Sequence, residues 1–310
     1  MPLRWVAGWF CSWLVLGAAL GAAYQTGLWR RSPAVPVISV WRPDGGGVMV
    51  MDVERYVVGV VAAEMPALFH PEALKAQAVA ARTYALRALH TGRRVPHHPD
   101  AVVTASVLDQ DWASPAMMRE RWGSDEAFRV YWARIEEAVR ATRGQILTYG
   151  GEPIEALYHA SSGGRTESAD AYFSTYRPYL TSVPDPSGCP ASCGAETVRM
   201  PWRDVAARLG LPGSPGKAVA VAERTPSGRA RTVRIGEAEL AARDVRERLG
   251  LPSTWFDVHV DGDDVVWTVR GSGHGVGMSQ YGADGMARRG MGYDAILRHY
   301  YPGSRLETVY

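Results

Sequence analysis

The chain has 310 residues, 46% hydrophobic and 21% charged, a composition that suits a folded globular protein and excludes a disordered one. The formal net charge is only +2 and Lys and Arg form no dense run, which argues against a nucleic-acid-binding protein. Cys189 and Cys193 allow one local disulfide or two free thiols, and with Cys11 they exclude a disulfide-rich scaffold.

The N-terminal segment predicts a membrane-spanning helix. No charge occurs between Trp5 and Trp29, and helical residues 5–23, at about 1.5 Å each, would extend roughly 28 Å, close to the thickness of a bilayer core. A signal peptide cleaved after Ala23 is the alternative. The expected arrangement is a cytoplasmic tail at 1–4, a transmembrane anchor at 5–27 and a linker at 28–36.

A β-hairpin and two helices are expected next. Asp52 is a natural N-cap, Pro66 must end the helix that follows it near Met65, and Pro71 suits the first turn of another helix. The elements predicted here are strands 37–41 and 48–51, a helix from 53 to about 65 and an alanine-rich helix from 71 to about 89.

The rest of the chain mixes helical and extended patterns. The elements predicted here are one or two helices in 114–141, a hairpin of 146–149 and 154–159, short helices at 202–209 and 237–249, strands 256–260 and 265–269, and a helix at 295–300. Without a regular βαβ alternation, this order indicates an α+β fold. We expect one globular region at 37–310, with a helical insertion at 91–143.

Three stretches together resemble one known family. They are the sequence from Glu54 to Pro66 with that from Glu72 to Tyr84, the segment 158–167 with 178–183, and the glycine-rich segment 271–283. In order and spacing they resemble the SpoIID/LytB family, the stage II sporulation protein D and amidase-enhancer group. The resemblance implies a peptidoglycan lytic transglycosylase that prefers glycan stripped of stem peptides and that lies outside the cytoplasm, anchored in the cell membrane by one helix.

The resemblance also implies partners. In spore formers these are an amidase that removes the stem peptides and a polytopic membrane protein of the engulfment machinery. No cofactor is expected, and because Val107 to Trp112 lacks the metal-binding Cys and His of some relatives, we expect no metal site. Thr181 stands where some relatives have Lys. The alternative function is a non-catalytic wall-binding module that stimulates an amidase.

Glu64 is the candidate catalytic residue. It lies at the C-terminal end of a predicted helix, between Ala63 and Met65. The negative end of the helix dipole and an apolar setting both raise the pKa of a carboxyl group, as a general acid near neutral pH requires. A solvated surface glutamate is the alternative interpretation from spacing alone, and the family motif favours catalysis.

Lys75, Gln77 and Arg82 are candidate substrate-binding residues on the second helix. Lys75 and Arg82 are seven residues apart, nearly on one stripe, and no acidic residue follows Glu72 in the helix to pair with them. We therefore expect both cations to hold the lactyl carboxylate of muramic acid, with Gln77 nearby. Solvated helix cations are the alternative.

The glycine-rich segment and a serine-rich loop supply the remaining candidates. Glycines alternate with other residues from 271 to 277, and an extended conformation would leave one face bare for a sugar ring. His274 would then bind substrate or orient Glu64, unless it is only structural. Ser161, Ser162 and Gly163 are read as a polar loop closing the cleft, with an ordinary turn as the alternative. Tyr179 and Gln280 are added as substrate-binding candidates because they lie in the matching stretches.

Overall fold

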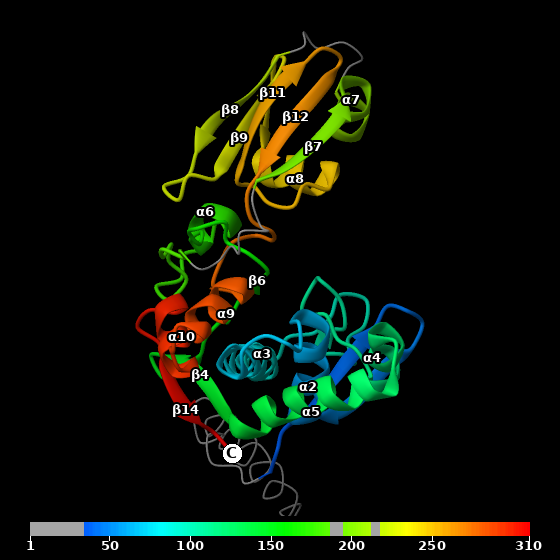
Figure 1. Cartoon of the computed structure of the whole chain (residues 1–310), viewed down its shortest axis with the longest axis vertical. Coiled ribbons are helices and arrows are strands. Elements are labelled where there is room, and N and C mark those ends of the chain that lie inside the picture. The colour runs from blue at the N-terminus through cyan, green and yellow to red at the C-terminus, as the bar shows by residue number, and fades with distance from the viewer. Residues whose placement is uncertain (1–33, 187–194, 212–217) are drawn as a thin grey trace, which may run out of the picture.

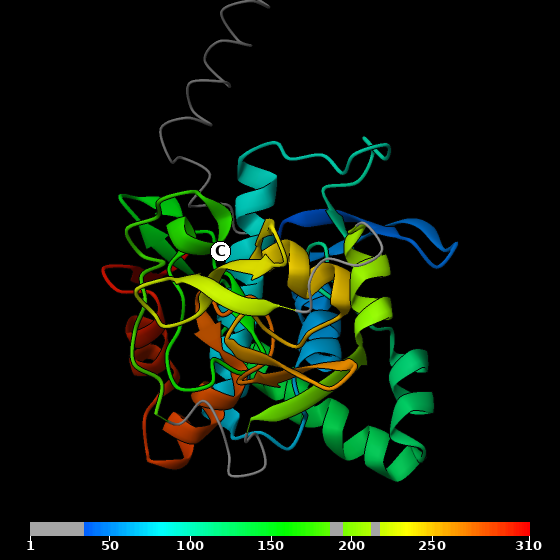
Figure 2. The same ribbon diagram turned by 90° about the horizontal axis from the view of Figure 1, so that it is seen from above.

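The structure, a computed structural model, describes residues 34–186, 195–211 and 218–310 and folds them into two lobes (Figure 1). The expected anchor at 5–27 and both Cys189 and Cys193 lie outside these ranges. None of the helices within them is long and apolar enough to cross a bilayer. Seen along the long axis, the small lobe overlies the main lobe (Figure 2). The mixture of small sheets and helices confirms the α+β prediction.

The main lobe begins as predicted. Strands β1 (Val37–Arg42) and β2 (Gly47–Asp52) form an antiparallel hairpin, which the short strand β3 (Val103–Thr104) extends alongside β1. Helix α2 (Val53–Glu64) starts where the Asp52 side chain accepts a hydrogen bond from the N–H of Arg55, and helix α3 (Pro71–His90) has proline in its first turn. Their apolar faces form the centre of the main core.

The segment expected to be a helical insertion contributes to that core. It forms α4 (Pro115–Trp122) and α5 (Asp125–Ala141), each capped by a serine. Helix α5 packs against α2 and α3, and Ile135 is fully buried between them. Residues 91–143 therefore contribute buried side chains to the main core.

The C-terminal elements complete the main lobe. Strands β4 (Gln145–Tyr149), β5 (Glu152–Pro153) and β14 (Arg305–Thr308) form one sheet, in the order β14-β4-β5. The expected strand 154–159 does not continue the hairpin beyond Pro153. Its end, β6 (Tyr158–His159), instead pairs in parallel with β13 (Met278–Ser279). The other elements here are α6 (Ala169–Phe173), α9 (Gln280–Arg288) and α10 (Tyr293–Tyr300).

The small lobe has its own core, packed around Trp267 and Phe256, which meet edge to face at 5.0 Å. Its elements are β7 (Glu196–Pro201), α7 (Trp202–Leu209), β8 (Val219–Arg224), β9 (Ala230–Ile235), β10 (Ala238–Ala241), α8 (Ala242–Leu249), β11 (Phe256–Asp261) and β12 (Asp264–Val269). Strands β8 and β9 were not predicted. The helix expected to start at Glu237 starts at Ala242, because 238–241 pairs with β9.

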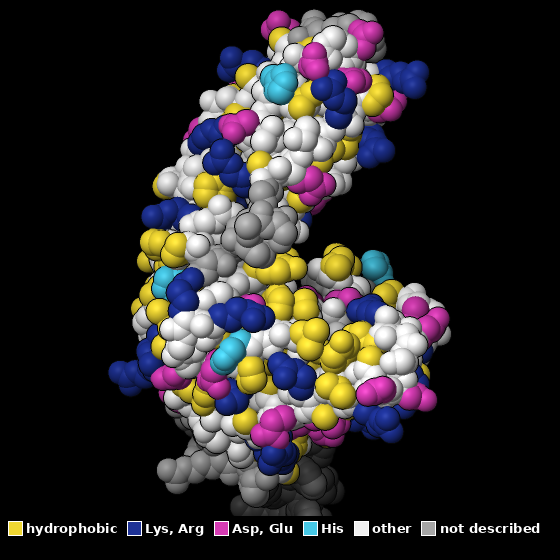
Figure 3. Space-filling view, in the orientation of Figure 1, with side chains coloured by type: hydrophobic (Ala, Val, Ile, Leu, Met, Phe, Trp, Pro, Cys, Tyr) yellow, Lys and Arg dark blue, Asp and Glu magenta, His cyan; other side chains and the backbone are white. Residues whose placement is uncertain are grey.

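Buried polar contacts join the two lobes. The carboxylate of Glu167 accepts hydrogen bonds from the hydroxyls of Thr225 at 2.6 Å and Ser227 at 2.8 Å. Arg229, fully buried, donates from Nη2 to the carbonyl of Ser162 at 2.7 Å. Because an unpaired buried charge is costly, these contacts hold the lobes in one orientation. Figure 3 shows the surface hollowed between them.

Candidate active site

Glu64 occupies the setting that the sequence predicts for it. It is the last residue of α2, half-buried, and its Oε1 accepts a hydrogen bond from the backbone N–H of Asp111 at 2.8 Å. Burial raises the pKa of Glu64, and the carboxylate of Asp111 raises it further. The N–H of Asp111 and the side chains of Gln280 and Tyr158 lower this pKa, but the net shift is upward. The carboxyl group therefore keeps its proton to a higher pH than an exposed glutamate does.

A buried hydrogen-bond network orients the groups around Glu64. The hydroxyl of Tyr56 donates to Oε1 of Gln110 at 3.1 Å, and Nε2 of Gln110 donates to the hydroxyl oxygen of Tyr158 at 3.0 Å. Because the oxygen of Tyr158 accepts this bond, its own proton is free to face Glu64. Tyr56, Gln110 and Tyr158 were not predicted as site residues, because they are far apart in the chain.

Gln280 is the one candidate substrate-binding residue whose effect on Glu64 is direct. It begins α9, immediately after β13, and its side chain lowers the pKa of Glu64. Among the described residues, however, no acceptor lies at hydrogen-bond distance and angle from the side-chain amide nitrogen of Gln280. Gln280 therefore acts on Glu64 from a buried position rather than as an exposed substrate contact.

The prediction that Lys75 and Arg82 lack acidic partners is wrong. Lys75 pairs with Glu72 at 2.7 Å. Arg82 is fully buried and pairs with Glu54 at 2.7 Å, and it also donates to backbone carbonyls of the main lobe. Arg82 therefore has no exposed surface with which to contact a glycan. Gln77 is fully buried too, and its amide has no hydrogen-bond partner among the described residues.

The serine-rich loop is part of the framework. Ser161 exchanges backbone hydrogen bonds with Ser272 at 3.0 and 2.8 Å. The hydroxyl of Ser162 donates to the carboxylate of Asp185 at 2.6 Å and accepts from the backbone N–H of Gly164 at 3.0 Å. Both serine side chains are buried. Tyr179 is buried as well, and its hydroxyl oxygen accepts a hydrogen bond from the backbone N–H of Glu155 at 3.2 Å.

The glycine-rich segment is not extended, so that prediction is wrong. All four glycines have positive φ, from 70° at Gly271 to 99° at Gly273. The bare side that was expected to receive a sugar ring is filled by the protein itself. A Cβ would lie 2.6 Å from the Ser161 carbonyl oxygen at Gly271, and 2.0 Å from the Leu157 carbonyl oxygen at Gly277.

His274 is held as a neutral ring. Its Nδ1 accepts from the N–H of Val276 at 3.1 Å, and a further hydrogen bond joins it to the backbone of Tyr158. Burial, together with nearby arginines, lowers the pKa of His274 to about 4. The residue therefore links the glycine-rich segment to the strand that carries Tyr158, and it is not a proton donor at neutral pH.

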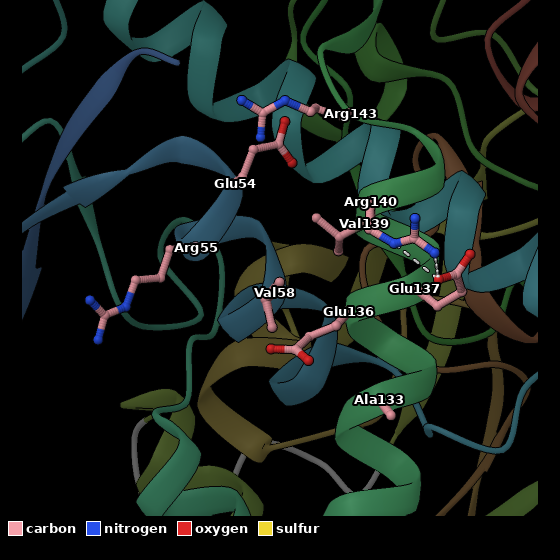
Figure 4. Close-up of a pocket in the computed structure, with 9 residues that line it drawn as sticks. All are labelled: Glu54, Arg55, Val58, Ala133, Glu136, Glu137, Val139, Arg140 and Arg143. Atoms are coloured by element: carbon pink, nitrogen blue, oxygen red, sulfur yellow. Dashed lines mark hydrogen bonds and ion pairs between the residues drawn. The ribbon is translucent and has the colours of Figure 1, made fainter. Parts of the chain in front are cut away.

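A hollow of about 480 Å³ lies at the opposite end of α2, between α2 and α5 (Figure 4). Its glutamates already have partners: Glu54 has Arg82, Glu136 accepts from the indole of Trp132, and Glu137 pairs with Arg140. Although burial alone would raise the pKa of Glu54, its pairing with Arg82 lowers it. A general acid needs the opposite shift, so this hollow does not suit acid catalysis.

The chain belongs to the stage II sporulation protein D (SpoIID) family, which confirms the resemblance. A family profile described as "SpoIID: Stage II sporulation protein" matches residues 45–149, the part that contains Glu64. Stage II sporulation protein D of Bacillus subtilis (strain 168) is 39% identical over 278 residues, 89% of this chain and 80% of that protein. The protein of the same name from Bacillus amyloliquefaciens is 39% identical, covering 86% of this chain and 77% of the relative. The amidase enhancer of B. subtilis is 28% identical, covering 81% of this chain and 40% of that protein.

Proposed function

We propose that this protein is a peptidoglycan lytic transglycosylase with Glu64 as its acid and base. The observation that carries the proposal is the setting of Glu64, a half-buried carboxyl group whose pKa burial raises. Because this shift lets Glu64 keep its proton to a higher pH, the carboxyl group is suited to donate that proton to a glycosidic oxygen. Membership of the SpoIID family supports a role in sporulation.

One carboxyl group suffices for this reaction. Glu64 donates its proton to the bridging oxygen as the bond between that oxygen and the anomeric carbon of N-acetylmuramic acid breaks. The 6-hydroxyl of the same sugar then bonds to the anomeric carbon and returns its proton to the Glu64 carboxylate. No water is consumed, and the products are a free 4-hydroxyl and a 1,6-anhydro end. The phenol of Tyr158 is placed to stabilise the carboxylate between the two proton transfers.

The carboxylate of Asp111 favours a second candidate, hydrolysis by water. Asp111 acts electrostatically on Glu64, and two carboxyl groups are what a hydrolytic glycosidase uses. Its Oδ1 accepts from the N–H of Trp112 at 3.0 Å, which fixes the carboxylate. In this scheme Glu64 protonates the leaving group, which then departs. Asp111 would activate a water molecule that enters the vacated space and attacks the anomeric carbon.

The experiment is digestion of peptide-stripped glycan by the wild type and by Glu64→Gln. Gln keeps the size of the side chain and the acceptor for the Asp111 N–H but transfers no proton. We expect cleavage to fall by about 100- to 10,000-fold while glycan binding persists. Mass spectrometry then separates the mechanisms, because anhydro ends are about 18 Da lighter than hydrolysed ends.

A non-catalytic amidase enhancer is the alternative that the similarity to the B. subtilis amidase enhancer favours. That function requires binding only. If the wild type releases no sugar from stripped glycan, and if Glu64→Gln stimulates a peptidoglycan amidase as well as the wild type does, the enzyme proposal fails. Circular dichroism should show that the variant is folded.

The cellular setting completes the proposal. The uncharged segment between Trp5 and Trp29 supports a single-pass anchor in the cell membrane, with the two lobes outside the cytoplasm. Stripped glycan as substrate further implies an amidase that supplies it and a polytopic membrane protein of the engulfment machinery. Fractionation of cells, with protease added from outside, tests this placement.

A further inference from the structure

Three rings from two distant segments pack together where the lobes meet. Tyr172 and Phe173 of α6 have ring centroids 4.8 Å apart. The ring of His274 lies 5.9 Å from Tyr172 and 5.5 Å from Phe173. All three side chains are half-buried, so each keeps some exposed surface. We call Tyr172, Phe173 and His274 the aromatic wall.

Helix α8 of the small lobe brings cations to this wall. Nη1 of Arg246 donates to the hydroxyl of Tyr172 at 3.0 Å, and the guanidinium of Arg243 lies 5.5 Å from the Tyr172 ring centroid. Arg243 is paired with Glu247 at 2.9 Å. Within the described ranges, Arg246 has no carboxylate at ion-pair distance. The charge of Arg246 is thus held against an aromatic surface without an acidic partner.

The aromatic wall is connected to the candidate active site. His274 is hydrogen-bonded to the backbone of Tyr158, whose side chain acts on Glu64. The ring of His159, the next residue, lies 5.7 Å from that of His274. Figure 1 shows α8 on the side of the small lobe that faces the main lobe. The wall and Arg246 therefore lie at the junction of the lobes, and Tyr158 connects the wall to Glu64.

The substrate of the proposed reaction needs a cation that the second helix does not supply. Muramic acid carries a lactyl carboxylate, and Lys75 and Arg82 are both paired with glutamates. A guanidinium binds a carboxylate through two parallel hydrogen bonds, and Arg246 keeps Nη2 without a partner that the described residues provide. Aromatic rings bury the apolar faces of ligands with little loss of side-chain entropy.

We propose that the aromatic wall and Arg246 form a glycan subsite that recognises the lactyl carboxylate of a muramic acid residue next to the cleaved bond. This inference rests on the proposed function, since it names a substrate contact of the same site. In this proposal the acidic sugar is recognised by Arg246 of α8, in the small lobe, rather than by Lys75 and Arg82 of α3. The small lobe thereby determines specificity, while the main lobe carries out the chemistry.

The test is binding measured by calorimetry, with the full-length protein carrying Glu64→Gln so that no ligand is consumed. One ligand is a peptide-stripped glycan oligosaccharide, and the other is a chitooligosaccharide of equal length, which lacks the lactyl carboxylate. Arg246→Gln should weaken binding of the first about tenfold and leave the second unchanged, because a charge-assisted hydrogen bond is lost. Phe173→Ala should weaken both about equally, because stacking does not depend on charge.

Matched variants make the outcome decisive. Arg248 is an exposed cation of the same helix, and its guanidinium donates to the Leu209 carbonyl. Arg248→Gln is therefore the control and should leave the affinity for both ligands unchanged. Arg246→Lys should retain part of the preference. If Arg246→Gln does not fold, Arg243→Gln replaces it and should weaken only the acidic ligand, roughly two- to threefold.

Equal affinity of Glu64→Gln protein for the two ligands would overturn the inference, and so would an unchanged preference in folded Arg246→Gln protein. Either result would leave the enzyme proposal standing if the wild type still produces anhydro ends. Conversely, an Arg246-dependent preference in a protein that cuts no glycan would support the subsite and refute the enzyme.

Discussion

Asp111 acts on Glu64 in two opposite ways. Its backbone N–H donates a 2.8 Å hydrogen bond to Oε1 of Glu64, which favours the carboxylate. Its own carboxylate raises the pKa of Glu64, which favours the protonated acid, and burial acts in the same direction and more strongly. A substitution at position 111 replaces the side chain and keeps the backbone N–H. It therefore separates the effect of the carboxylate on the pKa of Glu64 from that of the hydrogen bond.

Asp111→Asn should therefore lower the pKa of Glu64. The protonated fraction at neutral pH then falls, and the alkaline limb of the profile of kcat/KM against pH moves to lower pH. The loss at pH 7 should be less than about tenfold if the shift is below one unit. Rates of glycan release measured from pH 5 to 9 test this. If hydrolysis rather than transglycosylation operates, the variant loses activity at every pH.

Glu64→Gln should be more stable than the wild type at pH 7. Burial raises the pKa of Glu64 in the folded protein, so the folded state binds this proton more tightly than the unfolded chain does. Stability from this group is therefore present below its ordinary pKa and is lost as pH rises through the raised one. We expect the melting temperature of the variant to exceed that of the wild type at pH 7, with the difference shrinking towards pH 4.

Glu72→Gln is the control of opposite sign. Burial alone would raise the pKa of Glu72, but hydrogen bonds from Lys75 and from the N–H of Tyr293 lower it overall. Its contribution to stability is thus present above the ordinary pKa and is lost as pH falls. Thermal unfolding should show this variant less stable than the wild type at pH 7. The same sign of change in both variants would contradict these assignments.

Arg82→Met should destabilise the fold rather than weaken glycan binding alone. It leaves Glu54, whose side chain is 12% exposed, without its partner, at a cost of about 3–5 kcal/mol. Urea unfolding measures this loss, and Glu54→Gln in the same protein should recover part of it. Lys75→Ala, which breaks a partly exposed pair, should cost at most about 1 kcal/mol. If Arg82→Met and Lys75→Ala lower the free energy of unfolding by similar amounts, the Arg82–Glu54 pair is not the more important of the two for stability.

Gly277→Ala should be much more destabilising than Gly210→Ala. Both glycines have positive φ, 75° and 69°, so both substitutions carry the same backbone strain, about 1–2 kcal/mol. Only at Gly277 does the new Cβ meet backbone, 2.0 Å from the Leu157 oxygen, whereas none of the described residues lies within contact distance of a Cβ at Gly210. We expect at least about 2 kcal/mol more for Gly277→Ala in chemical unfolding. Equal losses would mean that the close approach is easily relieved.

Local signals predicted the first half of the fold well. Asp52 caps α2, Pro66 follows its end, and Pro71 opens α3, all as the sequence indicates. These features work through neighbours within one or two turns, so no distant residue is needed to recognise them. The hairpin β8–β9 was missed, and 238–241 was read as helix, because these strands are defined by their pairing with each other.

The sequence by itself determined the family and the candidacy of Glu64, because both depend on motifs and on the position of one residue at a helix end. Only the tertiary structure decided which charges are free. Arg82 finds Glu54 across 28 positions of the chain, and the carboxyl group of Glu64 meets Asp111 across 47. Coulomb energy and desolvation depend on distances in space, so helical spacing alone left these pairs undetermined.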